Sequence, residues 1–194
     1  MRFDEYSYGT IARFYDWLAG VYSRGQIAAS KRRQLDEIEC GDRVLYAGVG
    51  SGEDALLAAR FGARVTAIDL APEMLERFAK QLAREDLDAE LICGDVSVHK
   101  PAELYDAVVA NYFLNLFDVE HAREMLRHLG ELVKPGGALL LTDFARPQGG
   151  PIARVIGEIY YRPVNWIAWA LGFCALHPIL DYARLLEPMG FRIR

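Results

Sequence analysis

The chain has 194 residues, of which 52% are hydrophobic and 25% are charged, and its formal net charge is −5. Such a chain is long enough for one globular domain with a sizeable core. The negative balance argues against a protein that tracks nucleic-acid phosphates, because such proteins carry a basic surface. We therefore expect a single domain over residues 1–194 that does not bind nucleic acid.

The cysteines and histidines indicate neither a disulfide framework nor a metal site. Cys40, Cys93 and Cys174 are widely and irregularly spaced, which suits free thiols in a reducing compartment. The four histidines form no ligand-spaced cluster with cysteine, so we predict no bound metal. The first residues lack the apolar core of a signal peptide, and a cytoplasmic location is expected.

The first predicted element is a helical segment over residues 1–40, which ends in the turn Cys40-Gly41-Asp42. Apolar and aromatic residues recur in it at helical spacing: Ile11, Phe14, Tyr15 and Leu18. Its tyrosines have two interpretations. They form part of a lid over a ligand, or they are amphipathic rings where a helix contacts the domain.

A strand, a glycine loop and a helix follow. Val44–Ala47 is a short apolar run that leads to Gly48, Gly50 and Gly52. Glycine lets the backbone turn sharply and approach a ligand without a side chain in the way. The helical pattern then runs over residues 53–60. We therefore predict that a small ligand lies on this loop.

The second strand, Arg64–Ile68, delivers Asp69. An acid about twenty residues after a glycine loop, at the end of the next strand, is placed to accept hydrogen bonds from a ribose. The dinucleotide fingerprint G-x-G-x-x-G is altered here, because Glu53 stands where its third glycine should be and a second acid, Asp54, follows. A pyrophosphate at the helix start would meet two carboxylates. S-adenosylmethionine (SAM) has no phosphate and carries cationic groups, so we predict SAM, with NAD as the alternative.

The next helix opens at Pro72, which suits the first helical position. Its buried stripe is predicted to be Met74, Leu75, Phe78 and Leu82. The third strand, Ala89–Cys93, ends in Gly94-Asp95-Val96. A carboxylate at Asp95 can reach the exocyclic amine of a purine, although Gly-Asp also forms turns.

The fourth strand, Tyr105–Ala110, leads to polar and aromatic groups that begin with Asn111 and Tyr112, where open α/β sheets bind ligands. A helix capped by Asp118 is predicted over residues 119–133. The run Lys134-Pro-Gly-Gly is predicted to end that helix. A fifth strand over 138–142, a helix over 179–189 and the start of a strand over 191–194 complete the pattern. This alternation predicts an α/β fold with a mostly parallel sheet and helices on both faces.

Residues 146–180 interrupt the alternation. Their middle, Val164–Leu176, is uncharged and includes Trp166, Trp169 and Phe173, but it is too short for a membrane span, which needs about twenty residues. We consider three interpretations: an apolar cap over a substrate pocket, a peripheral membrane contact, or a homodimer surface. The cap is the one we favour.

Five stretches in register resemble class I SAM-dependent methyltransferases over nearly the full length. They are Val44-Leu-Tyr-Ala-Gly-Val-Gly-Ser-Gly, Ala67-Ile-Asp-Leu-Ala-Pro-Glu-Met-Leu, Cys93-Gly-Asp-Val, Leu132-Val-Lys-Pro-Gly-Gly and Leu186-Glu-Pro-Met-Gly-Phe. The chain is most similar to the ubiquinone/menaquinone-biosynthesis C-methyltransferases and related lipid methyltransferases. The stretches that carry this likeness are Phe14-Tyr-Asp, Thr142-Asp-Phe-Ala-Arg-Pro and His177-Pro.

The resemblance implies a Rossmann-like fold and a set of cofactor contacts. Gly48, Gly50 and Gly52 would line the methionine part, Asp69 would hold the ribose, and Asp95 with Val96 would flank the adenine. The remaining cofactor-binding residues that it implies are Tyr15 in the lid, Ala47, Val49, Leu70, Met74 on the adenine face, and Asn111 near the methionine end.

Three departures from the family pattern stand out. Tyr46 occupies a position that is usually acidic. Leu114 stands where quinone methyltransferases often have an arginine before an asparagine. The antiparallel hairpin that normally ends the fold is incomplete at Arg194.

The implied reaction is methyl transfer from SAM to a small lipophilic acceptor, quinone-like or lipid-like, with S-adenosylhomocysteine (SAH) as the product. Tyr112, Tyr160 and His177 are candidate acceptor-binding residues near the expected mouth of the pocket, and no residue is assigned as catalytic. The alternatives are an NAD-dependent oxidoreductase and a non-catalytic SAM-binding protein.

Overall fold

The computed structural model describes residues 33–143 and 182–193, and three regions lie outside it: residues 1–32, 144–181 and 194. Most of the predicted lid over 1–40 and the whole predicted cap over 146–180 fall in those regions. Within the described residues, strands and helices alternate, as the sequence predicts.

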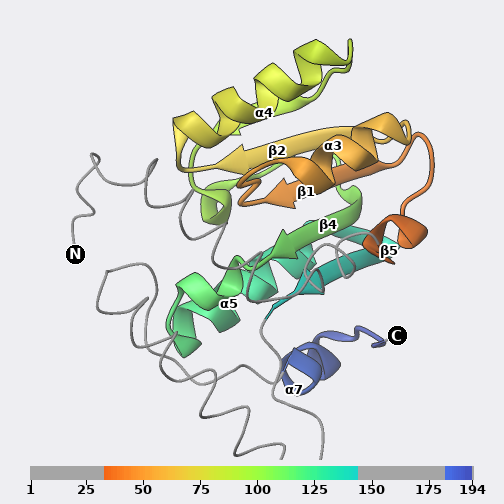
Figure 1. Ribbon diagram of the computed structural model, residues 1–194. Coiled ribbons are helices and arrows are strands. Elements are labelled where there is room, and N and C mark those ends of the chain that lie inside the picture. Colours follow the sequence, from red (N-terminus) through yellow and green to blue (C-terminus); the bar gives the residue numbers. More distant parts are fainter. Residues whose placement is uncertain (1–32, 144–181, 194) are drawn as a thin grey trace, which may run out of the picture.

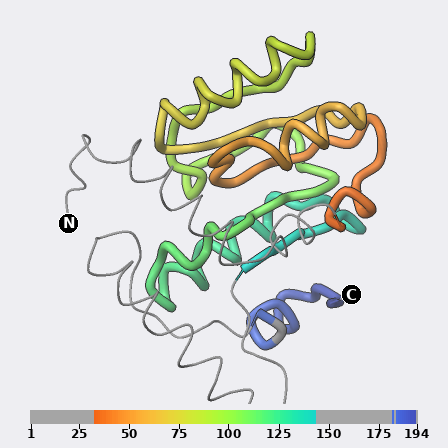
Figure 2. Tube along the Cα trace, in the orientation of Figure 1, coloured from red at the N-terminus to blue at the C-terminus, as the bar shows by residue number. Residues whose placement is uncertain are grey.

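Five parallel strands form one sheet. They are β1 (Arg43–Ala47), β2 (Arg64–Asp69), β3 (Glu90–Cys93), β4 (Tyr105–Asn111) and β5 (Val133–Thr142). Their order is β3-β2-β1-β4-β5, so the chain runs outward from β1 to β3 and then returns to the other side of β1 (Figure 2). The α/β fold with a parallel sheet is therefore confirmed. Ligands bind such sheets beyond the carboxyl ends of the strands, where the order reverses, and here that point lies between β1 and β4.

Helices cover both faces of the sheet (Figure 1). The α-helices are α3 (Glu53–Arg60), α4 (Pro72–Arg84), α5 (Val119–Glu131) and α7 (Tyr182–Leu186). Short 3₁₀ turns are η1 (Gln34–Glu37), η2 (Val96–Val98), η3 (Leu114–Leu116) and η4 (Glu187–Met189). α3 and α4 pack on one face, and α5 with α7 packs on the other.

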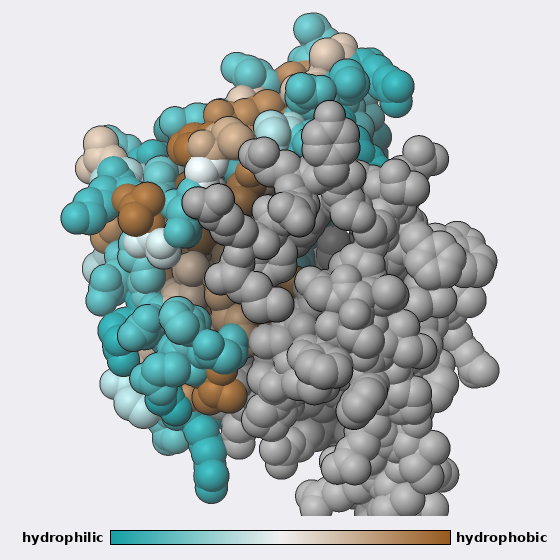
Figure 3. Space-filling model, turned by 90° about the vertical axis from the view of Figure 1, so that its left-hand side faces the viewer, coloured by the Kyte–Doolittle hydropathy of each residue, from teal (hydrophilic) through white to brown (hydrophobic). Residues whose placement is uncertain are grey.

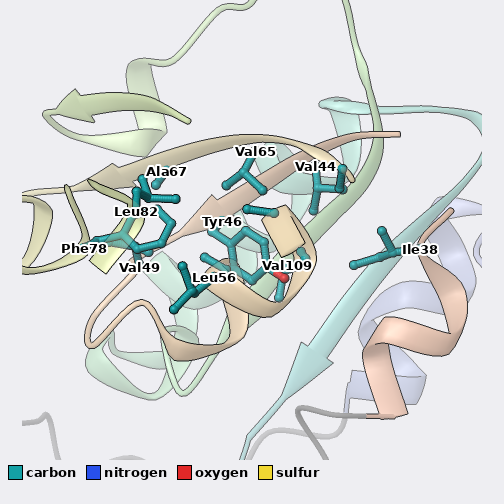
Figure 4. Close-up of a cluster of buried hydrophobic side chains, with 14 of the residues drawn as sticks. Ile38, Val44, Tyr46, Val49, Leu56, Val65, Ala67, Phe78, Leu82 and Val109 are labelled. Atoms are coloured by element: carbon teal, nitrogen blue, oxygen red, sulfur yellow. The ribbon is translucent and has the colours of Figure 1, made fainter. Parts of the chain in front are cut away.

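Side chains of β1 alternate between the two faces of the sheet and contribute to the hydrophobic core on each face. Val44 and Tyr46 join the cluster under α3 and α4, which Figure 4 shows, whereas Leu45 and Ala47 join the cluster under α5. Successive side chains of a strand point to opposite faces, so a central strand with two covered faces is apolar throughout. These four residues are between 0% and 4% exposed, which fixes β1 as the centre of the fold.

The predicted starts of two helices are confirmed by their local chemistry. One oxygen of the Asp118 carboxylate accepts hydrogen bonds from the backbone N–H groups of Glu120 (3.1 Å) and His121 (3.0 Å), which caps α5. Pro72 is the first residue of α4, where its missing N–H costs no helical hydrogen bond.

The boundary between α5 and β5 differs from the prediction. α5 ends at Glu131, and β5 begins at Val133 rather than at Ala138. Val133 already pairs with Tyr105, and the register then shifts before Ala138 pairs with Ala107. The Pro-Gly-Gly run therefore lies in an irregular part of the strand instead of preceding it, because a local shift accommodates residues that cannot fit a regular ladder.

The end of the described chain also differs from the prediction. Residues 191–193 form no strand, and the described sheet contains no antiparallel member. Phe191 instead packs against α5, where a Cβ added at Gly130 would lie 3.1 Å from its ring. The predicted last helix is seen as α7 followed by η4, and residues 179–181 are outside the described part.

Two general properties complete the description. No helix within residues 33–143 or 182–193 combines the length and the apolar character needed to cross a membrane. Cys40 and Cys93 are exposed free thiols, as expected, whereas Cys174 lies outside the described residues.

We expect Leu129→Ala to lower the free energy of unfolding by about 2–5 kcal/mol, because Leu129 is 0% exposed in the core under α5 and its loss leaves a cavity. Urea denaturation would measure the change. Leu116→Ala is the matched control, since Leu116 is 44% exposed, and it should shift stability by no more than about 0.5 kcal/mol. Equal effects of the two substitutions would contradict this account of the core.

Candidate functional site

The carboxyl ends of the strands bring most of the described candidate residues to one edge of the sheet. Figure 3 looks onto this edge and shows apolar side chains among hydrophilic ones. Residues 48–52 leave β1 there, Asp69 ends β2, and Asn111 and Thr142 end β4 and β5 as register partners. Parallel pairing therefore produces the arrangement that the sequence predicted for a ligand site.

The three glycines of the loop after β1 all have positive φ angles, but their surroundings differ. A Cβ added at Gly48 would lie 2.7 Å from the ring of Phe113, and one at Gly52 would lie 2.5 Å from Phe78. At Gly50, no described atom would lie within 4 Å of an added Cβ. Gly48 and Gly52 are thus held against the core, whereas among the described residues nothing packs where a side chain of Gly50 would lie.

Asp69 shapes this loop directly. Its Oδ2 accepts a hydrogen bond from the Gly50 N–H (3.1 Å), and its Oδ1 accepts one from the Ala71 N–H (2.9 Å). A carboxylate oxygen can accept a second bond, so both oxygens can also accept from a diol. Leu70, which follows, is 71% exposed beside this carboxylate.

Asp54 and Asn111 form the centre of a polar network on the other side of the loop. The Asn111 Nδ2 group donates to Asp54 Oδ2 (2.6 Å) and to Gln34 Oε1 (2.9 Å). The Gln34 Nε2 group donates to Asn111 Oδ1 and to Thr142 Oγ1, both at 2.9 Å. Asp54 is only 5% exposed, so of the two acids that argued against a pyrophosphate, only Glu53 lies at the surface.

Tyr46, which replaces the usual acid, also holds the start of α3 in position. Its ring is 4% exposed among the side chains of Figure 4, and its hydroxyl donates to the backbone carbonyl oxygen of Asp54 (3.2 Å). Burial, and then the nearby Asp54 carboxylate, raise the pKa of Tyr46. The phenol is therefore neutral and fixes the first turn of α3 through a hydrogen bond.

The residues predicted to surround the adenine lie after β2 and β3. Met74, in the first turn of α4, is half-buried, and Asp95 is exposed. Asp95 Oδ1 accepts from the Ser97 N–H (2.8 Å), so the predicted turn exists. The Val96 side chain is 4% exposed in the core, which leaves its backbone as the part able to meet a ligand.

The segment after β4 is aromatic and conformationally unusual. Tyr112 has a φ of 52°, rare for a residue with a side chain, and its N–H donates to the Thr142 carbonyl oxygen (2.7 Å). Phe113 packs on Phe117 with 5.2 Å between ring centroids. Such strained positions are concentrated at functional sites. Tyr15, Tyr160 and His177 lie outside the described residues, so their roles stay predictions.

The sequence did not reveal several contacts that hold the site. Gln34 and Thr142 join the network described above, and Gln81 Nε2 donates to the Ser51 carbonyl oxygen (2.8 Å). The Tyr182 hydroxyl of α7 donates to the Asp143 carboxylate just after β5. The spacing of residues in the sequence does not predict such contacts. The one available signal is Asp54, an acid on the otherwise apolar side of a helix, which indicates that it needs a polar partner.

Comparisons with known proteins identify the relatives of this chain. A family model described as a methyltransferase domain matches residues 44–137. Demethylmenaquinone methyltransferase of Corynebacterium urealyticum is 31% identical over 83% of this chain and 68% of its own length. The enzyme of the same name from Renibacterium salmoninarum is 30% identical over 81% of this chain, which spans 65% of that protein.

Solved structures agree on the fold. The YcgJ protein from Bacillus subtilis matches with a TM-score of 0.66 at 17% identity, over 83% of this chain and 67% of that one. At this identity the match concerns architecture alone.

We expect Gly52→Ala to destabilise the protein more than Gly50→Ala. Both substitutions force a side chain into a left-handed conformation, at about 1–2 kcal/mol. Only Gly52→Ala also collides with Phe78, which adds about 1–3 kcal/mol of overpacking strain. Urea denaturation of the two variants would measure the difference, and a larger loss for Gly50→Ala would show that the loop packs differently.

Proposed function

Because this chain belongs to the class I SAM-dependent methyltransferase family, near the demethylmenaquinone methyltransferases, we propose that it transfers the methyl group of SAM to a small lipophilic acceptor. The observation that carries the proposal is the backbone of Gly50, hydrogen-bonded to Asp69 at the edge of the sheet. A glycine loop next to an acid suits a ribose-bearing ligand, and the acids at the start of α3 disfavour a pyrophosphate there.

The described residues fit the parts of SAM. The glycine loop would line the methionine part, whose cationic ammonium group tolerates the acids Glu53 and Asp54 in the first turn of α3. Asp69 would accept from the ribose hydroxyls, and the exposed Leu70 and half-buried Met74 would cover the adenine. Asp95 would accept from the adenine amine with the oxygen that does not bind Ser97.

SAM supplies a methyl group that its sulfonium already activates. The share of the protein is then to align the acceptor, to exclude water, and to receive a proton if the nucleophile must lose one. Tyr112 directly follows β4, and we propose that it contacts the acceptor together with Tyr160 and His177. The lid over residues 1–40 and the cap over 146–180 belong to the same proposal.

The segment after β4, which we propose faces the acceptor, is rich in aromatic and apolar residues. Tyr112, Phe113 and Phe117 follow β4, and Leu116 among them is 44% exposed. Leu114, where quinone methyltransferases often carry an arginine, is 2% exposed and faces the core. The aromatic residues and the exposed Leu116 support a lipophilic acceptor. The names of the relatives favour a quinone-like one, whereas the leucine at position 114 argues against it.

We expect Asp69→Asn to weaken SAM binding by about tenfold to a hundredfold, because a neutral amide cannot accept from the loop, from Ala71 and from a diol together. Isothermal titration with SAM would give the affinity, and circular dichroism would check the fold. Asp88→Asn, at an exposed residue, is the matched control and should bind as the wild type does. Unchanged affinity in a folded Asp69→Asn protein would remove Asp69 from the site.

Turnover tests the reaction itself. We expect the wild-type protein to move radiolabel from methyl-labelled SAM into an organic extract containing a demethylated quinone, with SAH formed in equal amount. A phospholipid extract in a parallel reaction distinguishes a lipid-like acceptor. Tight SAM binding without labelling of either extract would favour a non-catalytic SAM-binding protein.

A further inference from the structure

We infer that Gln34 is a positioning residue for the cofactor site, acting through Asn111 and Asp54 on the start of α3. Its side chain spans the ends of β4 and β5, since it binds both Asn111 and Thr142. The ligand-binding part of this inference rests on the proposed function. The geometric part concerns the glycine loop alone.

The hydrogen bonds of the network fix one another. A carboxylate oxygen of Asp54 accepts, so Asn111 must present Nδ2 to it (2.6 Å). Asn111 Oδ1 then accepts from Gln34 Nε2, and the second N–H of Asn111 donates to Gln34 Oε1, both at 2.9 Å. The remaining hydrogen of Gln34 Nε2 goes to Thr142 Oγ1. Both amides are thereby held in one orientation.

This network holds the glycine loop at its downstream end. Asp54 is the second residue of α3 and follows Gly52 by two positions, so its position sets where the first N–H groups of the helix point. Upstream, the loop is held by the bond from the Gly48 N–H to the Ile68 carbonyl oxygen (2.9 Å) and by Asp69. A shift of Asp54 would therefore move the downstream half of the loop relative to Asp69.

The amide of Asn111 is placed to hold Asp54 in position and is not placed to bind the ligand directly. Both of its N–H groups and its oxygen are engaged by Gln34 and Asp54. Without Gln34, the Asn111 oxygen would lose its donor in a half-buried place, and the amide could rotate away from Asp54. Gln34 thus keeps Asn111 directed at Asp54, although Gln34 lies outside the alternation of strands and helices after residue 43.

The test uses the full chain with Gln34→Met, which keeps the length of the side chain and removes its hydrogen bonds. Hydrogen–deuterium exchange of peptides covering residues 48–55 reports the loop without any ligand. Isothermal titration with SAH reports binding. Leu129→Ala serves as the structural control, because it destabilises the core on the face of the sheet opposite α3.

We expect Gln34→Met to speed exchange over residues 48–55 and to weaken SAH binding by about fivefold to twentyfold. Leu129→Ala should lower stability more, yet keep wild-type SAH affinity, because the folded fraction stays near one. In a double-mutant cycle, Gln34→Met should add little to Asn111→Leu, since both remove the same restraint on Asp54.

Wild-type exchange over 48–55 in Gln34→Met would overturn the inference, and so would additive effects of the two substitutions. A wild-type protein that does not bind SAH would overturn the proposed function alone, because the exchange measurement needs no ligand. If Gln34→Met does not fold, Gln34→Glu replaces it. That variant keeps an oxygen that accepts from Asn111 but turns its second carboxylate oxygen toward the Asn111 oxygen, so its effects should have the same direction and be at least as large.

Discussion

The parallel pairing of β1 with β2 on one side and with β4 on the other is the constraint on which the rest of the structure depends. It places the carboxyl ends of the strands at one edge and makes the strand order reverse beside β1. Both faces of β1 are buried, so a shift of one residue would turn Tyr46 out of its cluster and Leu45 into it. Packing on two faces thus determines where the glycine loop begins.

The glycine loop, residues 48–52, contains three glycines and is restrained by polar contacts from several elements. Asp69 binds it from β2, Gln81 from α4, and Asn111 binds its downstream neighbour Asp54 from β4. Glycine loses more conformational freedom on ordering than other residues do. Restraints that exist before a ligand arrives lower the entropic cost of binding, because that part of the chain is already ordered.

The sequence predicted the fold well because burial leaves a periodic signal. The apolar strands, the Asp118 cap and the Pro72 helix start follow from local chemistry and are all present. The sequence-based prediction was wrong at residues 133–137. The Pro-Gly-Gly run there predicts an interruption, but pairing with Tyr105 makes these residues part of β5. The prediction also missed the bond between Gln34 and Asn111, which are 77 residues apart and are brought together only by the tertiary fold.

The site was predictable in its position more than in its contacts. Spacing predicts Asp69 and the glycines as site residues, and the structure adds a hydrogen bond between Asp69 and Gly50. The sequence indicates Asp54 only as a second carboxylate at the start of a helix, whereas the structure shows that it is a buried acceptor. A linear pattern shows which residue types are near a strand end, but it does not show which way each side chain turns.

Tyr46 has a consequence for the conditions under which the loop keeps its shape. A buried carboxylate at this position would have to lose its hydration shell, and mild acid would neutralise it. The phenol instead holds the Asp54 carbonyl oxygen with a neutral hydroxyl whose pKa burial raises further. This one contact is a hydrogen bond between neutral groups, and it is therefore insensitive to ionic strength and to acidification.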